Sequence, residues 1–175
     1  MSKKSKDPGR FARSGVQGEH PYGDMGQFIC LLVFLVVWIL DSFVFHFSIV
    51  FSSSLSFLVQ GLIALPIIVV SVYLVLSGHR AISDEVQAAP RVLRDGAFAY
   101  VRHPLYLAGL LFYILLLVFN LSLLSLAVFA GIIIFYNFIA AYEEKGMEQR
   151  FGREYADYKA AVGRWLPKLF ARKSQ

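Results

Sequence analysis

Two groups of charged side chains flank a long apolar stretch in the second half of the chain, and their types suit the binding of a charged small molecule. Arg102 and His103 come directly before this stretch, and Glu143 and Glu144 come directly after it. A carboxylate pair binds an ammonium group, whereas arginine and histidine bind a carboxylate. With apolar walls around them, these residues predict a pocket for a zwitterion, provided that the fold brings both groups to the same end of a helix pair.

The residues beside the basic group support this interpretation. Pro104 suits the first turn of a helix, where its missing N–H costs nothing, and it leaves the adjacent amides directed at a bound anion. Gly96 lets the backbone approach a ligand closely. Each charged group alone also fits a simpler role, a basic flank before a membrane span or a solvated helix end after one, and Arg102 fits either flank or site. Their combination at one end of a hairpin favours a site.

The composition indicates an integral membrane protein. Hydrophobic residues make up 57% of the 175 residues, above the share typical of soluble domains. All 17 lysines and arginines fall within residues 1–25, 78–104 and 143–175, and between these segments the one acidic residue is Asp41. Because the basic residues flank apolar runs rather than forming a separate domain, nucleic-acid binding is not expected. The single cysteine, Cys30, excludes an internal disulfide and is read as a small packed hydrophobe.

Three apolar stretches predict four membrane spans, since a span needs about 20 apolar residues. The last stretch, residues 105–142, would reach about 57 Å as one helix, far more than the roughly 30 Å core of a bilayer. It must fold back, and Asn120 to Ser122 offer a turn, because Asn tolerates left-handed geometry and Ser caps the next helix. The predicted fold is all-α, with four transmembrane helices, a C-terminal helical hairpin and a cytoplasmic amphipathic tail; the spans cover about 26–47, 55–77, 104–119 and 122–142.

The distribution of Lys and Arg predicts the orientation. With four spans, the N-terminal tail 1–22, the loop 78–103 and the C-terminal tail 143–175 share one face, and these segments hold the basic residues, so this face is cytoplasmic. We expect residues 1–22 to be a flexible basic tail and 23–175 to form a single membrane domain. Both termini are then cytoplasmic, in a prokaryotic inner membrane or plasma membrane.

Polar and helix-breaking residues inside the spans are few. Asp41 is the one ionisable residue well inside a span, but it lies near the outer end of its helix, so interfacial anchoring is favoured over a proton or metal site. His46 falls one turn further out, in the interface. Pro66 is expected to kink the second span. No cluster of His, Cys or Asp has the spacing of a metal site.

Two blocks in the C-terminal half resemble a known superfamily. GAFAYVRHPLYLAG, followed about 30 residues later by EEKGMEQRFGREYADYKAAVGRWLP, is similar to the isoprenylcysteine carboxyl methyltransferases and phospholipid methyltransferases over residues 90–167. The resemblance implies an integral membrane enzyme that binds S-adenosyl-L-methionine at the cytoplasmic face. It also implies that the enzyme methylates a lipophilic acceptor reached from the bilayer lipids.

The resemblance also implies roles for individual residues. His103, Pro104, Leu105 and Tyr106 match the cofactor-binding block, and Phe98 stands where the family often has Tyr. By the same resemblance, Val92 and Leu93 line the adenosine, and Glu143 contacts the methionine part of the cofactor. No catalytic residue is assigned, although Glu144 or a tyrosine is available as a base. Tyr155, Tyr158 and Trp165 either pack over the site as a lid or anchor the tail at the interface.

Two departures from the family pattern bear on the substrate. Ile139 occupies the position where isoprenylcysteine enzymes carry an arginine, which disfavours a prenylated cysteine carboxylate, and the segment 79–96 lacks the Gly-x-x-Trp of many relatives. The acceptor group and the oligomeric state stay open. The alternatives are a non-catalytic four-helix scaffold and a transporter or channel subunit, the latter disfavoured by the scarcity of ionisable residues in the spans.

Overall fold

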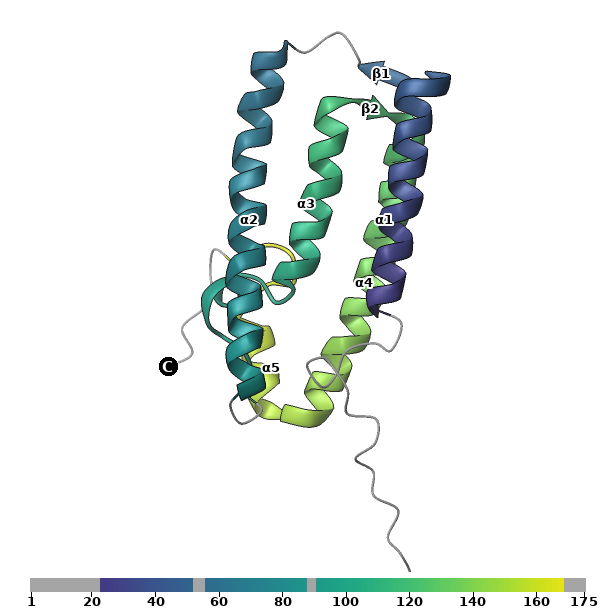
Figure 1. Ribbon diagram of the computed structural model, residues 1–175. Coiled ribbons are helices and arrows are strands. Elements are labelled where there is room, and N and C mark those ends of the chain that lie inside the picture. Colours follow the sequence, from purple (N-terminus) through teal and green to yellow (C-terminus); the bar gives the residue numbers. More distant parts are fainter. Residues whose placement is uncertain (1–22, 52–55, 88–90, 169–175) are drawn as a thin grey trace, which may run out of the picture.

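The protein is a bundle of long helices with a short helix folded back at one end (Figure 1). The computed structural model describes residues 23–51, 56–87 and 91–168, so the expected flexible tail 1–22 lies outside the described residues. Its elements in chain order are α1 Gly23–Ile39, a π-helical turn η2 Leu40–Phe45, β1 Ile49–Phe51, α2 Phe57–Gln87, a 3₁₀ turn η3 Gly96–Ala99, α3 Pro104–Phe119, β2 Leu121–Ser122, α4 Leu123–Phe151 and α5 Arg153–Ala161.

Three helical segments are long and apolar enough to cross a membrane: Gly23–Phe45, Phe57–Ser83 and Leu123–Phe151. The fourth expected span is α3, whose 16 residues have the predicted bounds and reach about 24 Å, shorter than a typical span. Large apolar side chains such as Phe43, Leu62 and Ile134 are 64%, 66% and 72% exposed. An apolar surface of this extent suits lipid as the surrounding solvent, and the chain is an integral membrane protein. The four-span arrangement and the sidedness remain predictions.

Two of the helices extend further than the expected spans. α2 continues through Pro66 and on to Gln87, into the segment expected as a loop. α4 continues to Phe151, nine residues past the uncharged part that ends at Tyr142. We therefore take Leu123 to Tyr142 as the membrane-spanning part of α4. The charged turns beyond it carry the site described below.

The helices pack as two pairs, α2 along α3 and α1 along α4 (Figure 1). The pairs meet in a buried cluster of α1, α3 and α4, where the rings of Phe34 and Tyr113 lie 4.7 Å apart between centroids. The other buried members of this cluster are Leu110, Leu117, Phe129, Ile132 and Tyr136. This apolar contact holds the α3–α4 hairpin, and with it the start of α3 and the end of α4, in a fixed relation.

The hairpin turns where the sequence predicts it. The Ser122 hydroxyl caps α4 by accepting a hydrogen bond from Ser125 N at 3.0 Å, as expected. Asn120 does not use left-handed geometry, however, because its φ of −151° is extended. The extended backbone lets β2 pair antiparallel with β1, a small two-stranded sheet that the all-α prediction did not include.

The Asp41 side chain joins the connections at the end of the bundle where β1 and β2 pair. Its side chain is only 3% exposed, so it does not anchor the helix in the interface as expected. Instead its carboxylate accepts hydrogen bonds from Phe47 N at 3.0 Å, Ser48 N at 3.1 Å and the Ser122 hydroxyl at 2.5 Å. His46 ends η2 with a φ of 52°, and its N–H bonds to the Asp41 carbonyl. The buried carboxylate thus joins the α1–β1 connection to the α3–α4 turn.

We predict that Asp41→Ala lowers the free energy of unfolding by at least about 2 kcal/mol, because it leaves two amides and the hydroxyls of Ser48 and Ser122 without their charged acceptor. The measurement is unfolding of the purified protein in mixed micelles with increasing denaturing detergent. Asp24→Ala is the matched control, since Asp24 is exposed in the first turn of α1. Equal effects of the two substitutions would contradict the bridging role of Asp41.

Candidate functional site

A cavity of about 130 Å³ lies at the end of the bundle opposite to Asp41, where α3 begins and the charged turns of α4 follow its span. Its walls come from the end of α2, the segment before α3, the charged turns of α4, and α5. All eight residues that the sequence predicts for cofactor binding line this one cavity: Val92, Leu93, Phe98, His103, Pro104, Leu105, Tyr106 and Glu143. The structure adds Ile82, Arg102, Glu144, Met147, Tyr155 and Tyr158 to the lining.

The α3–α4 hairpin brings the basic and acidic groups together, as the spacing predicts. The Tyr106 hydroxyl donates a hydrogen bond to Glu143 Oε1 at 2.5 Å. His103 Nδ1 lies 3.7 Å from Glu143 Oε2, and His103 Nε2 lies 3.2 Å from Glu144 Oε1. The His103 and Tyr106 rings are stacked with 5.4 Å between centroids. His103 therefore contacts both glutamates and a cavity-wall tyrosine.

Glu144 is the centre of an ion cluster. Its side chain is 1% exposed, and its oxygens lie 3.1 Å from Arg102 Nη2, 2.8 Å from Arg164 Nε and 3.7 Å from Lys159 Nζ. Arg164 Nη2 donates a second bond to Glu144 Oε2 at 2.9 Å, which makes the pair bidentate. We call Arg102, His103, Glu144, Lys159 and Arg164 the Glu144 cluster.

The Glu144 cluster determines the ionisation of its members. Glu144 lies past the membrane-spanning part of α4. Burial alone would raise its pKa, but the hydrogen bonds from His103 and Arg164 and the charge of Arg102 outweigh burial and hold the pKa well below its usual range. The hydrogen bond to Glu144 also raises the pKa of Arg164. The carboxylate is thus a permanent anion at neutral pH.

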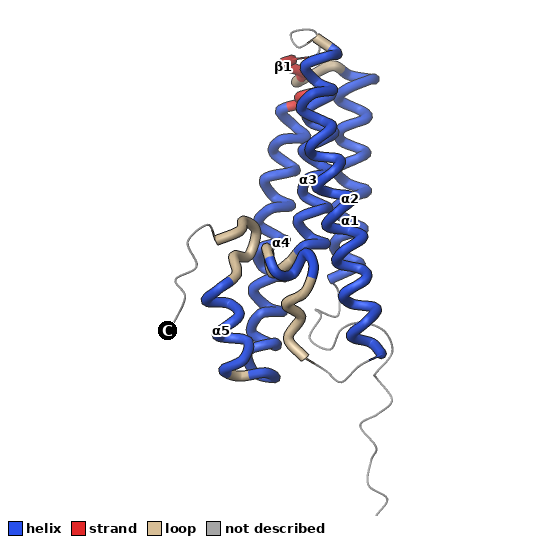
Figure 2. The backbone as a smooth tube through the Cα atoms, turned by 90° about the vertical axis from the view of Figure 1, so that its left-hand side faces the viewer, coloured by secondary structure: helices blue, strands red, loops and turns tan. Residues whose placement is uncertain are grey.

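The segment after α5 closes against the start of α3. Arg102 N donates to Gly163 O at 3.0 Å, and Arg102 Nη1 donates to Lys159 O at 3.0 Å. Glycine is required at position 163, because a Cβ there would collide with the carbonyl oxygen of Leu166. Trp165 Nε1 donates to Asn137 Oδ1 at 2.8 Å. Figure 2 shows α5 folded back beside the end of α4, which places this segment next to the cavity.

Two tyrosines of α5 form part of the cavity wall. Tyr155 and Tyr158 are each 4% exposed, and the Tyr158 hydroxyl donates to Phe98 O at 2.7 Å. Both line the cavity, which is consistent with packing over the site, and the rings of Trp165 and His103 lie 5.8 Å apart between centroids. Burial raises the pKa of both α5 tyrosines above the ordinary value for a phenol. They are therefore neutral at physiological pH.

Some expectations are refined by the structure. Gly96 has a φ of 58°, but what approaches it closely is the Ser77 hydroxyl of α2, which also accepts a hydrogen bond from Ala97 N at 2.8 Å. The glycine thus lets η3 pack closely against α2, and it is not among the residues that line the cavity. Arg102, open between flank and site, has a side chain only 8% exposed and belongs to the site. Ile139 is buried at 2% exposure and is not among the cavity-lining residues.

The sequence did not identify three features of the site: Glu144 as the centre of the ion cluster, Arg164 as its bidentate partner, and Asn137 as an acceptor for Arg164 and Trp165. Arg164 lies in the closing Arg-Trp-x-Pro of the second block, which gave the available signal. Asn137 is an amide within an otherwise apolar part of α4, and it accepts from Arg164 as well as from Trp165. A polar side chain at such a position is a signal for an internal partner.

The chain is similar to a known protein family. The family model described as phospholipid methyltransferase matches residues 56–154, which is more than half of the chain. The matched region runs from the start of α2 to the start of α5 and includes all eight predicted site residues. No curated protein and no solved structure matches the chain.

We predict that Glu144→Gln lowers the free energy of unfolding by about 3–5 kcal/mol, because it leaves the buried Arg102 without its counter-charge. Detergent-induced unfolding measures the change. Glu148→Gln is the matched control one turn further along α4. Glu148 Oε1 lies 2.6 Å from Lys159 Nζ, but the Glu148 side chain is 41% exposed, so this ion pair should contribute less than about 1 kcal/mol.

The stabilisation lost in Glu144→Gln should depend on pH. Because the folded pKa of Glu144 is lowered, its contribution is complete above the unfolded value of about 4.3 and is lost progressively as the pH falls below that value. The difference in unfolding free energy between wild type and Glu144→Gln should therefore be constant near neutral pH and shrink in acid. A difference that grows on acidification would contradict the anionic assignment.

Proposed function

The chain belongs to the phospholipid methyltransferase family, which implies a membrane methyltransferase, and from this premise we propose that it transfers a methyl group from S-adenosyl-L-methionine to a lipophilic or lipid-linked acceptor at the cytoplasmic face. One observation carries the proposal. Eight residues, two from just before the first sequence block and six from the two separated blocks, line a single cavity beside a buried ion cluster, at the helix ends where the basic residues gather.

The cavity residues fit the chemical parts of the cofactor. Val92, Leu93 and Phe98 provide an apolar and aromatic wall for an adenine ring. Glu143 is an anion for the ammonium group of the methionine part. Arg102 Nε is buried and has no hydrogen-bond partner among the described residues, so it offers a donor for the methionine carboxylate. A zwitterion with an aromatic end matches this donor set.

The chain's own residues then act mainly by positioning. Bound S-adenosylmethionine supplies a methyl group that its sulfonium already activates, so alignment of the acceptor and exclusion of water account for most of what the protein adds. Tyr155 and Tyr158 exclude water from the wall formed by α5. Glu144 is not the base, because its oxygens are engaged by the cations of its cluster. The neutral α5 tyrosines are not bases either, and we assign no catalytic residue.

The charges of the cavity favour an acceptor without a carboxylate at the methylated end. The cations of the Glu144 cluster are already paired with that carboxylate, and the one buried unpartnered donor among the described lining residues, Arg102 Nε, suits the cofactor itself. Ile139, where isoprenylcysteine enzymes have arginine, adds no cation. An amine, hydroxyl or thiol on a lipid fits these surroundings better than a prenylcysteine carboxylate.

The alternatives have less support. In the described part of the spans, Asp41 is tied by hydrogen bonds to the α1–β1 connection and to the α3–α4 turn, so it does not provide a step in an ion pathway. A scaffold would use the Glu144 cluster to hold its tail, but it would have no need of the adjoining cavity with its aromatic wall and its glutamate.

We predict that the purified protein binds S-adenosylhomocysteine and that His103→Ala and Glu143→Ala each weaken binding at least about tenfold, the loss of one good polar contact. Isothermal titration in detergent measures the dissociation constants. His79→Ala and Glu148→Ala are the matched controls, because both side chains lie outside the cavity lining. Wild-type affinity in both site variants would show that the cofactor binds elsewhere.

A second prediction concerns the reaction. Membranes containing the wild-type chain and S-adenosylmethionine labelled in the methyl group should transfer label to the organic extract, and His103→Ala membranes should transfer at least about tenfold less. Mass spectrometry of the labelled lipids identifies the acceptor. Cofactor binding without any labelled lipid would support the scaffold instead.

A further inference from the structure

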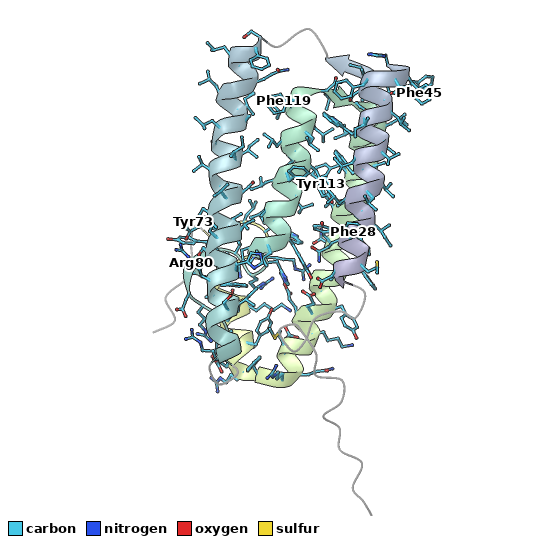
Figure 3. The ribbon with its side chains drawn as sticks, in the orientation of Figure 1. Phe28, Phe45, Tyr73, Arg80, Tyr113 and Phe119 are labelled. Atoms are coloured by element: carbon cyan, nitrogen blue, oxygen red, sulfur yellow. The ribbon has the colours of Figure 1, made fainter. Side chains whose placement is uncertain are left out.

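A second hollow lies on the outer side of α2 and is separate from the cofactor cavity. This groove of about 370 Å³ shares no lining residue with that cavity; its walls are Tyr73, Leu76, Ser77, Arg80, Ala81, Asp95 and Gly96. Figure 3 shows Tyr73 and Arg80 on the side of α2 that faces away from α1 and α4. The groove therefore opens toward the surroundings of the bundle rather than into its interior.

The groove carries an unpaired positive charge. Arg80 is exposed and makes no hydrogen bond or ion pair with any residue whose side chain the structure describes, which leaves out residues 50–55 and 84–90. The acidic lining residue, Asp95, is already paired with Arg91 at 2.8 Å. The groove thus attracts an anion, and a guanidinium group binds phosphate oxygens through two parallel hydrogen bonds.

An exposed apolar row leads along α2 to this charge. Leu62, Leu65, Val69 and Leu76 are 66%, 62%, 59% and 54% exposed and recur at helical spacing on the face that ends at Arg80. Tyr73, 47% exposed, lies on the same face seven residues or about 10 Å before Arg80. The face is complementary to a phospholipid, which has one anionic end and a long apolar remainder.

We propose that this groove binds a phospholipid of the leaflet at the cofactor-cavity end of the bundle, with its phosphate on Arg80 and an acyl chain along the Leu62–Leu76 face. A free phosphate would use the guanidinium but not the apolar row. This lipid is not the methyl acceptor, because the groove does not open into the cofactor cavity's lining. The site is a second lipid contact of the protein, independent of the methyl-transfer proposal.

The test is native mass spectrometry of the delipidated full chain in detergent. Titration with dioleoylphosphatidylglycerol should give a first bound lipid at least about tenfold tighter than titration with dioleoylglycerol, which lacks the phosphate. Arg80→Ala should remove most of that difference and Arg80→Lys should keep part of it. Arg153→Ala, which removes an exposed arginine of α5 outside both hollows, is the matched control and should bind like wild type.

Three results would overturn the proposal: equal affinity of Arg80→Ala and wild type for the phospholipid, no preference of the wild type over dioleoylglycerol, or displacement of the lipid by inorganic phosphate at equal concentration. Arg80→Gln replaces Arg80→Ala if the latter does not purify. Binding of S-adenosylhomocysteine is measured on the same samples. If Arg80→Ala loses the phospholipid but still binds S-adenosylhomocysteine, the groove is separate from the cofactor cavity. The two measurements can thus contradict the lipid proposal and the cofactor proposal independently.

Discussion

The burial of Glu144 is the constraint on which the functional end of the molecule depends. A carboxylate that is 1% exposed is costly unless cations and donors satisfy it, and here they come from the two residues before α3, from α5 and from the segment after α5. These three segments are brought together because each supplies part of the same counter-charge. The cavity walls contributed by α3 and α5 are in this way fixed relative to α4.

At the opposite end of the bundle, the buried carboxylate of Asp41 likewise holds separate segments together. In lipid, apolar helices gain little from contact with one another compared with contact with acyl chains, so apolar packing alone specifies their arrangement weakly. Buried carboxylates that collect donors from different loops specify it better, since each unsatisfied donor would be expensive. Asp41 joins the α1–β1 connection to the α3–α4 turn, and Glu144 joins the α3 start to the tail. Between them the helix pair is held by the cluster around Tyr113.

Much of this could be predicted from the sequence, because apolar length and charge placement are local properties. The hairpin turn and the α3 bounds follow from apolar length and turn residues, and the meeting of His103 with Glu143 and Glu144 follows from the spacing of the two charged groups. The other cavity residues were implied by the resemblance to the methyltransferases. The β1–β2 pairing did not follow, since it joins Ile49 to Ser122 and depends on where two helices end. The role of Arg164 also depends on a long-range contact, made after α5 has folded back onto α4.

The adjacent glutamates show why residue type alone does not assign a role. Successive residues on an α-helix point about 100° apart, so Glu143 and Glu144 face different surroundings. Both line the cavity, but Glu144 is held by the cations of its cluster as a structural anion, whereas Glu143, 13% exposed, accepts a hydrogen bond from Tyr106. His103 contacts both. A ligand bound at Glu143 would therefore be positioned, through one imidazole, by the same buried charge that holds the tail in place.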